Sequence, residues 1–231
     1  MTDYRTVAAP VTASFVEKKS EFMAYLAPVH TQEEAAQVIE NVRREHRRAR
    51  HNVYAYLLRE GNASRYSDDG EPQGTAGMPI LDVLQKNGLT DICCVVTRYF
   101  GGVLLGANGL VRAYSHSAAL AVEQAQIQIM LPCYPVTIQS DYSLYGKIVY
   151  NLPQTDLVQL DTVFEDQVQL KLLVRDTLWE SLQKELIDLT GNQITMDVGK
   201  LQYADFSKSN KKISTKNAVK KEDFLTFKAY L

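Results

Sequence analysis

A continuous apolar run, DICCVVTRY at residues 91–99, limits the folds open to this chain more than any other stretch. Polar residues do not alternate with apolar ones along it, which is typical of a strand that is buried on both faces of a sheet. Cys93 and Cys94 are neighbours in the run, so their side chains point to opposite faces and cannot form a disulfide with each other. The sheet that contains this strand is therefore expected to be covered on both sides.

The first half of the chain is expected to surround this run with a hairpin and three helices. The charged turn VEKKS joins two extended stretches, and Thr31 with Glu34 forms a capping box before an amphipathic helix. Pro79 suits the first turn of a shorter helix, which Gly88 ends. The expected elements are strands at 7–15, 21–28, 52–58 and 91–99 and helices at 32–46, 79–87 and 110–125.

The stretch MLPCYP at 130–135 contains two prolines and marks the expected domain boundary. After it the expected elements follow the order βαββαβ, the ferredoxin-like arrangement. Ser143 is the expected cap of the first of these helices, and Thr177 with Glu180 caps the second. We therefore expect an α+β protein with an N-terminal domain of mixed sheet and helices at 1–131, a ferredoxin-like domain at 132–202, and a mobile Lys-rich tail at 203–231 that holds a weak strand at FLTFKAYL.

Composition excludes several classes of protein. A net charge of −2 over 231 residues is unlike that of proteins that coat polyanions, so any contact with nucleic acid must be local. No apolar run approaches the roughly 20 residues that span a bilayer, and the N-terminus lacks a signal-peptide pattern, so we expect a cytoplasmic protein. The three cysteines lack CxxC spacing and are expected to be reduced and packed. We expect no cofactor and no metal.

Three stretches of the first half could carry chemistry: SDDGEPQGTAG at 67–77, TRYFGGVLLGANGLVRAY at 97–114, and RREHRRARH at 43–51. The first two, together with EKKSEF and HNVYAY, resemble the IMPACT/YigZ family across the whole first half. The second half resembles the small ferredoxin-like domain that bacterial members append. Two positions depart from the family pattern. Asn108 stands where glycine is usual, and asparagine is expected to tolerate a left-handed backbone there. Val53 stands where relatives often carry cysteine, which disfavours a thiol mechanism at this strand.

The resemblance implies a role in translation control rather than a particular reaction. The eukaryotic members of the family resemble regulators that act through a partner of the kinase that senses uncharged tRNA. The first domain is similar to a fold shared by a ribosomal small-subunit protein and elongation factor G, and the second resembles a further domain of that factor. These similarities concern the fold and do not by themselves assign a function.

Two interpretations of the acidic and glycine-rich motifs stay open. In the first, the carboxylates pair with the two arginines and fix the glycine-rich loops against each other. In the second, backbone N–H groups at a helix start and an arginine hold an anion. A divalent metal on the carboxylates is less favoured, because no histidine joins them in sequence. The residues concerned are Asp68, Asp69, Glu71, Arg98, Gly101, Gly102, Gly106, Asn108, Gly109 and Arg112.

The third motif gathers five arginines within eight residues, and a helix would spread the first four over one side. Such a run is either a solvated helix face or a contact for RNA or the ribosome. The arginines are Arg43, Arg44, Arg47, Arg48 and Arg50.

We favour a non-enzymatic regulator of translation that binds RNA, the ribosome or a translation factor. The alternatives are a small hydrolase or phosphate-handling enzyme that uses the acidic residues with Arg98 and Arg112, and a module that binds only proteins. The chain lacks the GxSxG and HExxH motifs, which disfavours the enzyme. His51 and His116 are expected to pack or to form hydrogen bonds rather than to act as bases. The oligomeric state stays open.

Overall fold

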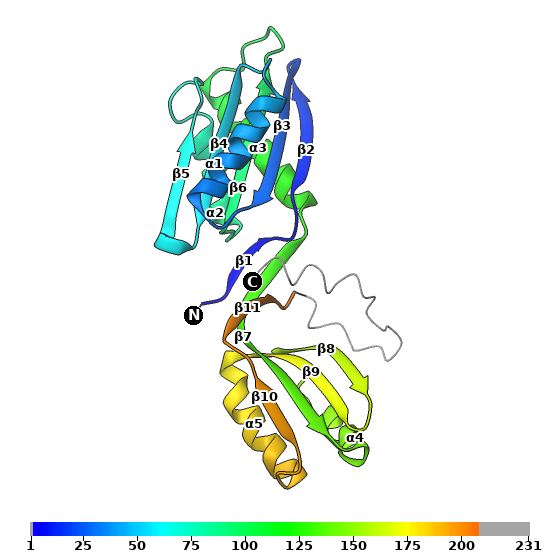
Figure 1. Ribbon diagram of the computed structural model, residues 1–231. Coiled ribbons are helices and arrows are strands. Elements are labelled where there is room, and N and C mark those ends of the chain that lie inside the picture. Colours follow the sequence, from blue (N-terminus) through cyan, green and yellow to red (C-terminus); the bar gives the residue numbers. More distant parts are fainter. Residues whose placement is uncertain (1, 208–231) are drawn as a thin grey trace. The chain divides into compact units, whose positions relative to one another are not determined.

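A computed structural model describes residues 2–207 and divides the chain into two compact units (Figure 1). Residues 4–128 form the N-terminal unit. Residues 129–207, together with residues 2 and 3, form the C-terminal unit. The division follows Gln128, close to the boundary expected after Leu131. Independent folding of the two units stays a prediction.

The N-terminal unit is built on a five-stranded antiparallel sheet with the strand order β2-β3-β6-β4-β5. Three helices, a short 3₁₀ turn and strand β1, which lies outside this five-stranded sheet, complete the unit. The strands are β1 (Tyr4–Val7), β2 (Val11–Glu17), β3 (Ser20–Pro28), β4 (His51–Leu58), β5 (Ala63–Ser67) and β6 (Ile92–Tyr99). The helices are α1 (Gln32–Glu45), α2 (Gly77–Lys86) and α3 (Ala107–Gln124), and the 3₁₀ turn is Glu60–Asn62.

The central strand β6 is buried on both faces, as the apolar run predicted. Cys93 and Val95 pack against α1 on one face, whereas Cys94 and Val96 pack in the larger core beneath α2 and α3 on the other (Figure 1). Burial raises the pKa of the Cys93 thiol to about 12, so this thiol stays protonated. Cys93, Cys94 and Cys133 are all unpaired and buried, as expected.

The predicted helices of this unit are present, with shifted ends. Thr31 caps α1 by accepting a hydrogen bond from the Glu34 N–H, which confirms the capping interaction. The strand expected at 7–15 is wrong in extent, because the chain leaves it after Val7 and re-enters a strand at Val11. β5 was not predicted, because its residues ASRYS are mostly exposed and show no apolar alternation.

The C-terminal unit has the predicted βαββαβ order along the chain. Its strands lie side by side in the spatial order β10-β7-β9-β8 and form an antiparallel ferredoxin-like sheet. Its helices pack on one face around Trp179, Leu182 and Leu186 of α5. A further strand, β11, pairs with the first part of β7. The elements are β7 (Ile127–Ser140), α4 (Tyr142–Asn151), β8 (Leu157–Phe164), β9 (Val168–Arg175), α5 (Asp176–Thr190), β10 (Thr195–Val198) and β11 (Gln202–Asp205).

Several expectations for the second half are corrected. The two prolines do not interrupt the strand. β7 continues through Pro132, which pairs with Tyr203, and through Pro135, which pairs with Leu173. Proline fits an extended backbone and lacks only the N–H donor. The start of the expected tail is wrong, because Tyr203 lies in β11. The weak strand expected at FLTFKAYL lies outside the described residues.

Two helix caps are also corrected. α4 begins one residue before Ser143, with Asp141 at the N-cap position, and α5 begins before Thr177, with Arg175 at that position. Within residues 2–207, none of the helices is both long and apolar enough to cross a membrane.

Candidate functional site

All three motifs meet at one end of the five-stranded sheet, which we call the motif end (Figure 1). Here β2, β5 and β6 finish and β3 and β4 begin. The strand registers fix this arrangement, since Glu17 pairs with Ser20, and His51 pairs with Arg98. α1 ends and α3 starts at the same end, because each is joined to a strand there. Residues distant in the sequence are therefore neighbours at the motif end.

Asp68 organises the loop that leads into α2. Its carboxylate accepts hydrogen bonds from the backbone N–H groups of Gly74, Ala76 and Gly77, at 2.9, 3.0 and 2.8 Å. The N–H groups of Ala76 and Gly77 belong to the start of the helix, where backbone donors lack partners within the helix. Asp68 thus acts as a side-chain cap that the sequence did not identify.

Asp69 ties the same loop to α1 and β4. One carboxylate oxygen accepts from the Asn52 N–H at 2.6 Å, and the other contacts Arg43 Nη2 at 2.9 Å. The Asp69 carbonyl accepts from His51 Nδ1 at 2.8 Å. His51 is therefore a hydrogen-bonding residue, as expected.

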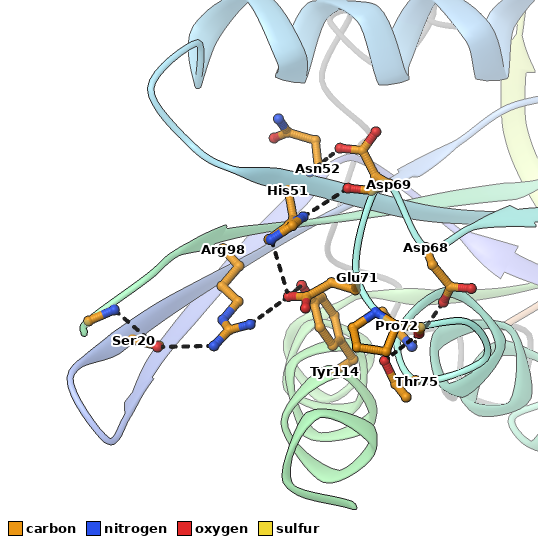
Figure 2. Close-up of polar contacts among 12 residues, drawn as sticks. Ser20, His51, Asn52, Asp68, Asp69, Glu71, Pro72, Thr75, Arg98 and Tyr114 are labelled. Carbon is orange, nitrogen blue, oxygen red and sulfur yellow. Dashed lines mark hydrogen bonds and ion pairs between the residues drawn. The ribbon is translucent and has the colours of Figure 1, made fainter. Parts of the chain in front are cut away.

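Glu71 lies at the centre of a buried polar network (Figure 2). Its Oε1 contacts Arg98 Nη1 at 2.6 Å and accepts from the Tyr114 hydroxyl at 2.8 Å. The Glu71 and Arg98 side chains are 4% and 6% exposed. Burial and the Glu71 carboxylate raise the pKa of Tyr114 far above its usual range, so this hydroxyl remains a donor.

Arg98 extends the network to the β2–β3 turn. Its Nη2 lies 3.5 Å from the Ser20 hydroxyl, which also accepts from the Gly101 N–H at 3.2 Å (Figure 2). The guanidinium also lies over the ring of Phe22. The network therefore joins the acidic loop, β6, α3 and the turn before β3 into one connected structure.

These contacts correct the expected pairing of Arg112. Arg98 does pair with a motif carboxylate, but Arg112 is exposed and its Nε donates to the Asn108 carbonyl at 3.3 Å. Asp69 pairs with Arg43 rather than with either of the two motif arginines. Within residues 2–207, no cluster of histidine, cysteine or carboxylate side chains could hold a metal.

The glycine-rich loop packs its backbone directly on the β2–β3 turn. A Cβ at Gly101 would lie 2.0 Å from the Lys19 carbonyl, so only glycine fits. Gly102 and Gly106 have positive φ angles of 82° and 73°. Asn108 lies inside α3, so the left-handed backbone expected at this position is wrong.

The five arginines divide into two groups. Arg43 pairs with Asp69, and Arg44 pairs with Glu40 one helical turn away. α1 ends at Glu45, so the other three lie beyond the helix and do not share its face as expected. These three are exposed and have no ion pair with a carboxylate of the described chain; we call them the arginine turn: Arg47, Arg48 and Arg50.

An exposed apolar loop follows β6 beside the arginine turn. Phe100, Val103 and Leu104 are exposed, and Leu104 reaches 81%. The Arg50 guanidinium lies 6.0 Å from the centre of the Phe100 ring. These three side chains were not predicted as a surface feature, although their presence in a glycine-rich loop is the signal that could have identified them.

Comparison with known proteins agrees with this architecture. A family model described as the Impact N-terminal domain matches residues 18–122, and one described as a domain of unknown function, DUF1949, matches residues 138–193. The first match spans the β2–β3 turn, the acidic loop and α3.

Whole-chain relatives extend the similarity. The chain is 33% identical to the IMPACT family member YvyE of Bacillus subtilis (strain 168), over 87% of this chain and 94% of that protein. It is 34% identical to the IMPACT family member YigZ of Escherichia coli (strain K12), over 85% and 98%. A crystal structure described as that of a hypothetical protein is 34% identical, with a TM-score of 0.56 over 85% of this chain and 97% of that one. The chain therefore belongs to the IMPACT family.

Proposed function

We propose that this protein acts in translation, in the cytoplasm, by binding RNA or the ribosome through the motif end of its N-terminal unit. The family resemblance supports the link with translation. The observation that carries the proposal is the arginine turn: Arg47, Arg48 and Arg50 are exposed, and none is neutralised by a carboxylate of the described chain. Guanidinium groups form strong, charge-assisted hydrogen bonds with phosphate groups.

The surroundings of the arginine turn favour a nucleic acid. Phe100 lies exposed beside Arg50, and an aromatic ring next to cations can stack on an unpaired base. Lys18 and Lys19 add positive charge at the same end. Glu17, Glu21 and Glu45 are also exposed there, so the charge is local, in keeping with the net charge of −2.

The enzyme alternative has less support. The three motif carboxylates already bind backbone N–H groups, Arg43, Arg98 and Tyr114, so a reacting group would have to displace internal partners. The protein-only alternative rests on the exposed Val103 and Leu104, which a protein surface could cover. The two binding alternatives differ in their dependence on the arginines.

Co-sedimentation with purified ribosomes tests the proposal. We would compare the wild type with a variant that replaces Arg47, Arg48 and Arg50 by glutamine. A matched control replaces three exposed lysines that do not belong to the motif end, Lys86→Gln, Lys184→Gln and Lys200→Gln, and so makes the same change in net charge.

We expect the arginine variant to lose ribosome association and the lysine variant to keep it. Both should melt like the wild type, because all six side chains are exposed. Equal association of the two variants with ribosomes would contradict the proposal. Ribosome-free capture of a protein by both variants would favour the protein-only alternative.

A further inference from the structure

A cleft of about 320 Å³ lies between the β2–β3 turn and the start of α3. Its polar lining is Glu17, Lys18, Arg112 and His116, and its apolar lining includes Phe15 and Leu105. The volume is at the lower end of the range for small-molecule sites, roughly 300–1,000 Å³. We propose that this cleft binds a phosphomonoester on a small organic group, as carried by a nucleotide or by the end of an RNA chain.

Arg112 supplies the main phosphate ligand of the cleft. Within residues 2–207, the only polar contact of its guanidinium is the bond from Nε to the Asn108 carbonyl, which is long at 3.3 Å. Its two terminal nitrogens are therefore available on an exposed side chain. A guanidinium presents its donors in a planar fork that matches two phosphate oxygens, so Arg112 can bind a phosphate through two parallel hydrogen bonds.

Lys18 stands on the opposite wall, in a turn that is fixed without a ligand. Lys18 and Lys19 have positive φ angles of 45° and 66°, in a two-residue hairpin turn where glycine or asparagine is usual. Gly101 packs against the Lys19 carbonyl, and the Ser20 hydroxyl accepts from the Gly101 N–H. The Glu71–Arg98 network holds Ser20 in turn. The buried motif therefore positions a lysine that faces the cleft.

The remaining lining suits the rest of such a ligand. Phe15 stacks on Phe22 with ring centres 5.2 Å apart and meets the edge of His116 at 4.7 Å, which fixes the imidazole beside the cleft. The α3 N-cap, Gly106, makes no side-chain cap bond, so the positive end of the helix dipole adds to the cations. The Glu17 carboxylate can accept a hydrogen bond from a hydroxyl or amino group of the ligand. Its negative charge disfavours an anion that lacks such a donor group.

The cleft shares no residue with the arginine turn, so this inference and the proposed function can fail separately. Calorimetric titration of the full chain would use four probes: adenosine 5′-monophosphate, adenosine, and one short RNA with either a 5′-phosphate or a 5′-hydroxyl. We expect the monophosphate to bind and adenosine not to bind. Preference for the 5′-phosphorylated RNA would assign the cleft to an RNA end, and equal binding of the two RNAs would assign it to a free nucleotide.

The variants Arg112→Gln and Lys18→Gln should each weaken monophosphate binding about tenfold, as expected for the loss of one charged hydrogen bond. Lys86→Gln, at the opposite end of the same unit, should bind like the wild type. His116→Gln is a further lining variant, and melting curves establish that each variant is folded. The inference is overturned if no phosphorylated probe binds saturably, or if the lining variants bind like Lys86→Gln.

Discussion

The Glu71–Arg98 pair should be the most sensitive point of the N-terminal unit, and Arg98→Met tests this. The substitution leaves Glu71 with a 4% exposed side chain, the Tyr114 hydroxyl as donor, and no adjacent arginine. Removing one partner of a buried pair costs about 3–5 kcal/mol, because the remaining charge stays buried. A domain of ordinary stability has only about 5–15 kcal/mol in total. We therefore expect a loss of roughly 10 °C or more in the melting temperature of this unit.

The single tryptophan provides a control within the same molecule. Trp179 is buried in the core of the C-terminal unit, so its fluorescence follows that unit, whereas circular dichroism follows both. In urea titrations followed by circular dichroism, the N-terminal unit of Arg98→Met should unfold at a lower urea concentration than that of the wild type. The tryptophan fluorescence transition, which follows the C-terminal unit, should stay unchanged. The double variant Glu71→Gln with Arg98→Met should regain part of the loss.

Two results would refute this reasoning. A wild-type transition in Arg98→Met would mean that the pair contributes nothing to stability. A fluorescence transition that shifts together with the dichroism would mean that the two units unfold as one, against the expected independence.

Three further predictions concern single features of the fold. Asp68→Ala should lower the free energy of unfolding by about 2 kcal/mol, because three N–H groups, two of them partly buried, lose their acceptor. An unchanged urea midpoint would contradict this. Gly101→Ala should destabilise the N-terminal unit by about 3 kcal/mol, because its Cβ would clash with the β2–β3 turn. Gly146→Ala, at a helical position with open space, should stabilise the C-terminal unit by up to about 1 kcal/mol. Melting temperatures that change in the opposite direction would refute the packing argument. The hydrogen bond to Asp91 raises the pKa of His30 above its ordinary 6.5. The stability that protonated His30 contributes is therefore complete below pH 6.5 and is lost as the pH rises through the raised pKa. His30→Asn should remove this pH dependence in urea titrations, and an unaltered dependence would contradict the prediction.

Much of the fold could be predicted where one local pattern determines an element. β6 followed from an unbroken apolar run, and α1 followed from Thr31 and Glu34 at its start. In α5, leucine recurs at helical spacing at Leu178, Leu182, Leu186 and Leu189, a pattern typical of a helix with one buried face, and Leu182 and Leu186 are buried. These signals depend on neighbours within a few residues, and tertiary contacts did not override them.

The site was less predictable, because ion-pair partners depend on strand register and helix orientation. Sequence alone could not show that Asp69 faces α1, so Arg43 was not recognised as its partner. Tyr114 was missed for the same reason, since only the packing of α3 brings its hydroxyl to Glu71. The β2–β3 turn carries two lysines in place of the usual Asn-Gly signal, which concealed its left-handed geometry.

The salt dependence of RNA binding tests the central claim most directly. Each arginine that neutralises a phosphate releases counterions, so the logarithm of affinity falls linearly with the logarithm of salt concentration. Replacing Arg47, Arg48 and Arg50 by glutamine should weaken the binding of structured RNAs whatever their base sequence. It should also make the slope shallower by about 2–3. The matched triple lysine variant should keep the wild-type slope. A wild-type affinity that ignores salt, or equal slopes for the two triple variants, would contradict the account.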